Sequence, residues 1–242
     1  MTLLTLFTAP KPFTDPHISV IQYNTLRNWQ ALGEAVEVLV VGDEPGIAEA
    51  CRELRVRHCP GVKTNASGTP LISSIFNLAR TASNAPCLAY ANADILFLPD
   101  LVQGTTILAR SCDQFLAVGQ RYDLDITESL DFSEGWDQAL QERVAEKGRL
   151  HGQSGSDYFI FPRQCFANIP DFAVGRAGWD NWMLFWARWQ HWPLVDATSA
   201  ITLVHQNHDY RHVPGGLKHF FQAETGENVK MAGGRRAIFR LS

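Results

Sequence analysis

The residues best placed to do chemistry in this 242-residue chain fall into three polar groups. They are Asn92 with Asp94, Asp180 between Trp179 and Asn181, and His205 with His208. Asp94 follows a mostly apolar strand expected from Cys87 to Ala91, and a carboxylate at the end of a buried strand is costly unless a charged group meets it. That group is usually a metal ion, a basic side chain or a ligand, whereas the structural alternative is an Asx-turn that only ends the strand.

Two further segments place polar groups where elements begin or end. The clearest strand of the chain, Val36 to Val41, stops at Gly42 and is followed by two carboxylates, Asp43 and Glu44. Thr69 as N-cap and Pro70 at the first helical position predict a helix start. The N–H groups at such a start suit an anion, although any solvated helix start has the same pattern.

The elements that must position these groups alternate between strands and helices. Strands are expected at 3–8, 36–41, 55–58, 87–91 and 115–119, and helices at 16–33, 47–54, 70–79 and 99–111. This order predicts an α/β fold with a mostly parallel sheet, in which ligands bind at the strand ends. Because neither G-x-G-x-x-G nor G-x-x-x-x-G-K-[ST] is present, dinucleotide dehydrogenases and P-loop enzymes are disfavoured.

Beyond residue 123 the pattern is looser. We expect a charged helix at 129–148, a polar loop at 151–157, a strand at 158–161, a helix at 182–192 and a last strand at 201–204. We expect one domain over 1–242, with a first half at about 1–122, a second half at about 123–212, and a tail or lid at 213–242.

Composition limits the classes of binding partner and the cellular compartment that we expect for this protein. The formal charge of −4, with 45% hydrophobic and 19% charged residues, indicates neither a nucleic-acid-binding face nor an acidic tail. Five scattered cysteines without C-x-x-C spacing favour a reducing compartment. Since no leader peptide or transmembrane segment is evident, we expect a cytoplasmic protein.

The order of three motifs along the chain resembles that of the glycosyltransferase A (GT-A) fold, as found in the transferases related to glycosyltransferase family 2. The motifs are Asn92-Ala93-Asp94, Asp180, and His205 or His208. The resemblance covers residues 1 to about 212. It implies a single Rossmann-like GT-A domain whose mostly parallel central sheet is flanked by helices. It also implies an enzyme that moves a sugar from a nucleotide-diphosphate donor to a hydroxyl of a saccharide or lipid-linked acceptor.

The resemblance assigns Asp94 to a divalent metal, Mn²⁺ or Mg²⁺, with His205 or His208 as a further ligand. Asn92 departs from the family's acidic residue, so a ribose or water-mediated contact is expected there instead. A hard cation with oxygen ligands stabilises a leaving diphosphate, and a histidine ligand favours Mn²⁺. We prefer His205 as the metal ligand, because it directly follows the last strand, and keep His208 as the substitute. The alternative for either histidine is a hydrogen-bonded structural residue that binds no metal.

The same resemblance makes Asp180 the general base of an inverting transfer. A helix start stabilises its carboxylate form, while apolar neighbours raise its proton affinity. The alternatives are a plain N-cap, or an orienting role in a retaining enzyme.

The resemblance implies further site residues. For the nucleotide they are Thr8, Pro10, Asp43 and Asn92, and for the donor sugar Asp157. Independently of the resemblance, Lys63 is expected to contact the nucleotide or its phosphates, with a solvated loop residue as the alternative. Lys218, Arg235 and Arg236 are expected either to close over the diphosphate or to belong to a solvated tail. Trp182, Trp186 and Trp189 share a helical face that predicts core packing, with peripheral membrane contact as the alternative for Trp179 and the outer tryptophans.

Three rival functions remain open. A sugar-phosphate nucleotidyltransferase needs a glycine-rich basic loop after the first strand, which Ala9-Pro10-Lys11-Pro12 does not supply. A carbohydrate-binding relative without turnover is favoured by Asn92. A metal hydrolase would use His205, His208 and Asp209.

Overall fold

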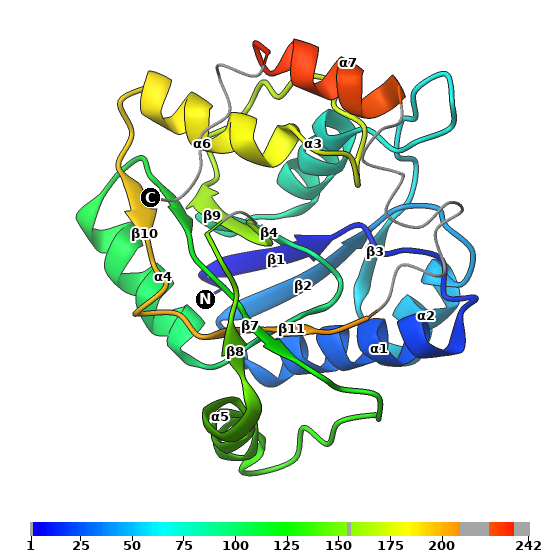
Figure 1. The fold of residues 1–242 in the computed structure, drawn as a ribbon, viewed down its shortest axis with the longest axis vertical. Helices are drawn as coiled ribbons and strands as arrows, with labels where there is room; N and C mark the ends of the chain where they lie inside the picture. The colour runs from blue at the N-terminus through cyan, green and yellow to red at the C-terminus, as the bar shows by residue number, and fades with distance from the viewer. Residues whose placement is uncertain (1, 154–155, 209–222, 235–242) are drawn as a thin grey trace.

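Two sheets organise the computed structural model, which describes residues 2–153, 156–208 and 223–234 (Figure 1). Within these residues the main sheet has seven strands in the order β10-β6-β9-β4-β1-β2-β3. Their bounds are β1 Leu4–Thr8, β2 Val36–Val41, β3 Arg57–Cys59, β4 Cys87–Ala91, β6 Leu116–Val118, β9 Tyr158–Pro162 and β10 Leu194–Asp196. The described helices are α1 Pro16–Ala31, α2 Ile47–Leu54, α3 Ile72–Ala82, α4 Asp100–Ser111, α5 Trp136–Lys147, α6 Trp179–Trp189 and α7 Ala223–Met231.

The main sheet is mostly parallel, as the sequence predicted. β1 pairs in parallel with both β2 and β4, and β3 and β10 extend the sheet in parallel with β2 and β6. β9 is the exception, because it runs antiparallel between β4 and β6. The polypeptide that follows residue 123 therefore returns to the middle of the sheet.

Helices cover both faces of this sheet. Alternate residues of β1 point to opposite faces, so that Leu4 and Leu6 pack with α1, α2 and α4, while Phe7 packs with α3 and α6. In Figure 1, α3, α6 and α7 lie on one side of the strands and α1 and α2 on the other. The two buried clusters give the three layers of an α/β fold.

A second sheet lies beside the first and was not predicted. Its described strands are ordered β5-β11-β7-β8, with β5 at Ile95–Phe97, β7 at Tyr122–Leu124, β8 at Arg149–Leu150 and β11 at Leu203–Gln206. β11 runs antiparallel to β5 and parallel to β7. This sheet joins the segment after β4 to the segment before His208.

Several predicted boundaries were wrong. α3 begins at Ile72 after Leu71, and the predicted start at Thr69 and Pro70 fails because Pro70 and Leu71 are extended, pairing with Thr64 and Ala173 in isolated bridges. The predicted helix at 182–192 runs from Trp179 to Trp189, and the predicted strand at 201–204 runs from Leu203 to Gln206. The charged helix expected at 129–148 is shorter, at Trp136–Lys147.

The start of the first helix is as predicted. Asp15 accepts hydrogen bonds from the backbone N–H groups of His17 and Ile18, and Pro16 occupies the first turn. All five cysteines are free. Among the described residues, every helix is too short or too polar to cross a bilayer.

Candidate active site

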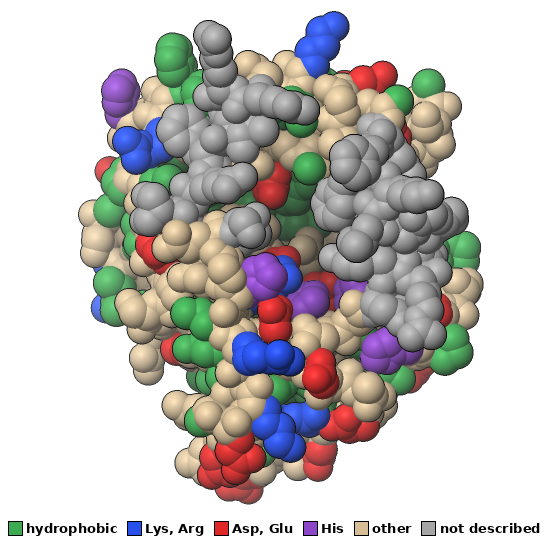
Figure 2. All heavy atoms as spheres, in the orientation of Figure 1, with side chains coloured by type: hydrophobic (Ala, Val, Ile, Leu, Met, Phe, Trp, Pro, Cys, Tyr) green, Lys and Arg blue, Asp and Glu red, His purple; other side chains and the backbone are tan. Residues whose placement is uncertain are grey.

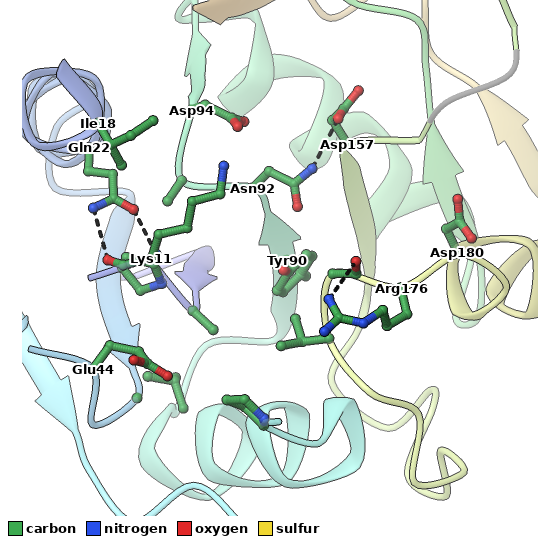
Figure 3. A pocket seen from close by; sticks show the side chains of 18 of the residues that line it. Lys11, Ile18, Gln22, Glu44, Tyr90, Asn92, Asp94, Asp157, Arg176 and Asp180 are labelled. Atoms are coloured by element: carbon green, nitrogen blue, oxygen red, sulfur yellow. Dashed lines mark hydrogen bonds between the residues drawn. The ribbon is translucent and has the colours of Figure 1, made fainter. Parts of the chain in front are cut away.

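The candidate site is a cavity of about 610 Å³ at the carboxyl ends of β1, β2 and β4. Seven of the predicted site residues line it: Pro10, Asn92, Asp94, Asp157, Asp180, His205 and His208. Figure 2 shows acidic, basic and histidine side chains gathered in a hollow in the middle of this face. In Figure 3, Asp94 and Asp180 come from different elements that border the same cavity. Both carboxylates, which sequence analysis had singled out, therefore border one cavity.

Asp94 and the two histidines form a cluster that suits a metal ion. Oδ2 of Asp94 lies 3.1 Å from Nε2 of His208 and 3.8 Å from Nε2 of His205, and one ligand atom from each residue lies within 4.8 Å of the others. Oδ1 of Asp94 is buried and has no hydrogen-bond partner within the described part of the chain. One carboxylate and two imidazoles are a donor set typical of Mn²⁺ and similar divalent ions, so the residues present fit such an ion.

Electrostatics keep Asp94 ionised. Burial alone would raise its pKa, but the hydrogen bond with His208 and the charges of His205 and Lys11 outweigh burial and lower the pKa to about 2. The carboxylate is therefore ready to bind a cation at any physiological pH.

The second sheet brings the cluster together. β4 ends at Ala91 and β5 starts at Ile95, and the backbone N–H of Ile95 donates to the carbonyl of Asn92 across the turn. His205 pairs with Ile95 on one side and with Asp123 on the other. Nδ1 of His205 lies 3.2 Å from Oδ1 of Asn207 and 3.5 Å from Oδ1 of Asp123, which turns Nε2 toward Asp94.

Asp157 is held by a network of side chains. Asn92 donates to its Oδ1 at 3.0 Å, and Arg121 donates to its Oδ2. Arg121 also donates to Asp123, which lies 2.7 Å from Nδ1 of His151. Both oxygens of Asp157 already have partners, so its contact with a donor sugar stays a prediction. Sequence reasoning missed Arg121, Asp123 and His151.

Asp180 lies in the first turn of α6 and is not its N-cap. The cap is Gly178, which has a φ of 113°, and its backbone N–H donates to Oδ1 of Asp180 at 3.2 Å. Burial raises the pKa of Asp180, hydrogen bonds from the amides of Asn181 and Gly178 partly offset this rise, and the charge of Asp157 adds to it. The side chain is half-buried, so it combines a raised proton affinity with access to the cavity.

Lys11 is a site residue that sequence reasoning missed. Its backbone is fixed by Gln22, whose side chain accepts from the Lys11 N–H at 2.7 Å and donates to the Lys11 carbonyl at 3.0 Å. The Lys11 side chain extends into the cavity near Asn92 (Figure 3). Burial lowers its pKa, and the charge of Asp94 partly restores it.

Three predicted nucleotide-binding residues lie outside the cavity lining. Thr8 is fully buried. The carboxylate of Asp43 accepts from the backbone N–H groups of Gly61 and Val62 at 2.8–3.0 Å, and Lys63 is exposed. Their contacts with a nucleotide stay predictions. Asp209, Lys218, Arg235 and Arg236 lie outside the described residues.

The tryptophan-rich helix mostly packs in the core. Trp182 is buried and stacks on the half-buried Trp186, and Trp179 packs against Tyr90 while also lining the cavity. Trp189 is 66% exposed, so the core position predicted for it is wrong. It is the last residue of α6 and stacks on Phe185.

Solved structures share the fold of this chain, although no protein-family profile and no curated protein matches the chain significantly. Glucosyl-3-phosphoglycerate synthase from Mycobacterium tuberculosis, solved with Mn²⁺, UDP and phosphoglyceric acid, has a TM-score of 0.55 at 13% identity, over 96% of this chain and 79% of that one. The mannosyltransferase PcManGT from Pyrobaculum calidifontis, solved with GDP-Man and Mn²⁺, has a TM-score of 0.53 at 14% identity, over 95% and 62%. Residues 1–349 of TarS from S. aureus, solved with UDP-GlcNAc, have a TM-score of 0.53 at 10% identity, over 96% and 65%.

These likenesses establish the fold. The chain has the GT-A fold of nucleotide-sugar glycosyltransferases, as the sequence motifs predicted. It spans less than two thirds of the TarS and mannosyltransferase chains that it matches.

Proposed function

We propose that this protein is a metal-dependent glycosyltransferase that moves a sugar from a nucleotide-diphosphate sugar to a hydroxyl of a saccharide or lipid-linked acceptor. One observation carries the proposal: the Asp94, His205 and His208 cluster and the carboxylate of Asp180 line the same cavity. Two similar structures were solved with Mn²⁺ and a uridine or guanosine diphosphate compound, which supports the same ligands here.

The donor fits the side of the cavity at the ends of β1 and β2. Pro10, Val41, Val62 and Pro70 give this side apolar walls on which a nucleotide can pack. The diphosphate would then lie between Lys11 and the metal cluster. A divalent ion bound by Asp94, His205 and His208 would stabilise the negative charge that develops on the leaving diphosphate.

Asp180 is proposed as the general base. It takes the proton of the acceptor hydroxyl while the hydroxyl oxygen forms a bond to the anomeric carbon, and the bond from that carbon to the diphosphate oxygen breaks on the opposite side. This single displacement inverts the anomeric configuration. The raised pKa of Asp180 suits the role, because a base with greater proton affinity removes the hydroxyl proton more readily.

The test is release of nucleoside diphosphate from UDP- and GDP-sugars, with and without Mn²⁺. Wild type should release product with Mn²⁺, and Asp94→Ala should lose about 10²- to 10⁴-fold, as expected if the ion contributes several kcal/mol. Asp131→Ala is the matched control, since Asp131 is exposed and bonds only to Ser133 among the described residues. Silence of wild type with every sugar nucleotide would favour a binding protein, and turnover of simple phosphoesters would favour a metal hydrolase.

A further inference from the structure

Helix α1 buries four polar side chains, of which Asn24, Thr25 and Asn28 bond residues of the second sheet. Gln22, Asn24, Thr25 and Asn28 are all at most 2% exposed. The core-facing side of a helix is normally apolar, and a buried amide is costly unless it is hydrogen-bonded. Each amide among these four has partners: Gln22 holds Lys11, Asn28 holds the backbone of Phe97, and Asn24 reaches the segment before α5.

Gln206 connects these polar side chains of α1 to the metal cluster, because it bonds both Asn24 and Thr25 of the helix and the backbone of Asp94. Its side chain is fully buried at the end of β11. Its Oε1 accepts from Nδ2 of Asn24 at 3.0 Å, and its Nε2 lies 3.0 Å from both the carbonyl of Ile21 and the hydroxyl of Thr25. One amide thus joins β11 to two turns of α1.

Gln206 also fixes the backbone of Asp94. Its backbone N–H donates to the Asp94 carbonyl at 3.0 Å, and its side-chain Nε2 lies 3.4 Å from the same oxygen. Because side chains alternate along a strand, Gln206 points to α1 while the preceding His205 points to the cluster. Gln206 therefore bonds the backbone of Asp94 and, as the residue that follows His205, also ties the backbone next to His205 to helix α1.

We infer that Gln206 is a positioning residue for the metal site, setting the separation of the Asp94 carboxylate and the His205 imidazole. This inference rests on the proposed metal-dependent function. Groups behind the ligands orient them, and their loss typically weakens metal binding by one or two orders of magnitude. Gln206 acts on the ligands through the backbone and is not one of the residues that would hold the cation.

The test compares Mn²⁺ affinity with fold stability. Gln206→Met keeps the length of the side chain and removes its hydrogen bonds, and Thr25→Val removes one partner with little change of shape. Asn228→Leu is the matched control: Asn228 is a buried amide that bonds the backbone of Ala173 and Arg176 and none of the three cluster residues. Mn²⁺ dissociation constants would come from electron paramagnetic resonance titration, and stability from thermal unfolding.

Gln206→Met should weaken Mn²⁺ binding by about tenfold or more. Thr25→Val should weaken it less, in the same direction, and it carries the test if Gln206→Met does not fold. Asn228→Leu should lower the melting temperature while its Mn²⁺ affinity stays that of wild type. The inference is overturned if the Gln206 and Thr25 variants bind Mn²⁺ like wild type. Absence of Mn²⁺ binding by wild type would instead overturn the proposed function.

Discussion

Nε2 of His208 lies 3.1 Å from Oδ2 of Asp94, although the two residues are 114 positions apart in the chain. β11 makes this approach possible, because it pairs with β5 directly after the turn that carries Asp94. His205 approaches the same oxygen at 3.8 Å. Sequence analysis preferred His205 and kept His208 as its substitute, whereas the structure brings both histidines to the carboxylate and places His208 nearer.

Both histidines are therefore expected to bind the cation. His205→Ala and His208→Ala should each weaken Mn²⁺ binding by at least about tenfold, since loss of groups behind a ligand alone costs 10- to 100-fold. Isothermal titration calorimetry measures the effect. His191→Asn is the control, because His191 is exposed and has a φ of 56°, which asparagine tolerates. If only one of the two alanine variants loses affinity, the other histidine is structural.

Asp180→Asn should abolish base catalysis without removing the binding site. Turnover should fall by about 10²- to 10⁴-fold, while the affinity for nucleoside diphosphate and Mn²⁺ stays unchanged. In wild type, kcat/KM should fall as the pH falls through the raised pKa of Asp180, above the range of an ordinary carboxyl group. A variant with residual turnover and the same acid limb would show that another group is the base.

The raised pKa of Asp180 also predicts a pH-dependent stability difference. A carboxyl group whose pKa is higher in the folded state than in the unfolded state stabilises the fold below its unfolded pKa, and this contribution is lost as the pH rises through the folded pKa. Asp180→Asn mimics the protonated form and keeps an oxygen that accepts from Gly178. Its free energy of unfolding in urea should therefore exceed that of wild type at neutral pH, with the difference shrinking toward acid pH. Equal stabilities at both pH values would contradict the shift.

Lys11 and Lys63 are alternative candidates for a lysine that contacts the nucleotide phosphates. The structure places Lys11 in the cavity and leaves Lys63 exposed outside it, although sequence analysis named Lys63 and not Lys11. Lys11→Met should weaken UDP or GDP binding by roughly 10- to 100-fold, as for loss of one hydrogen bond to a charged group. Lys63→Met should leave the affinity unchanged. Fluorescence or calorimetric titration of both variants decides between them, and the reverse order would restore the sequence-based prediction.

The sequence predicted the parts of the fold that carry strong local patterns. The long apolar strands β1, β2, β4 and β9 and the capped start of α1 follow from composition and spacing. The second sheet does not, because β5, β7 and β8 are two or three residues long and give no periodic pattern. The division of the chain near residue 122 stays a prediction.

The same limit applies to the site. Asp94, Asp180 and the histidines were predictable because charged residues stand out at the ends of apolar elements. Arg121, Asp123 and His151 were not, since their mutual contacts come from the pairing of β7 with β8 and β11. Thr69 looked like a cap, yet the backbone pairing of Leu71 with Ala173 displaced the helix start.

Thermal unfolding of wild type and Asp94→Ala with UDP or GDP, each with and without Mn²⁺, tests the central claim most directly. A ligand that binds only the folded state raises the melting temperature, by roughly 5–10 °C at about one hundred times its dissociation constant for a chain of this length. We predict that wild type shows this rise only when nucleotide and Mn²⁺ are both present, and that Asp94→Ala shows none. An equal rise without Mn²⁺, an equal rise in Asp94→Ala, or no rise in wild type with either nucleotide would contradict a metal-dependent nucleotide site at Asp94.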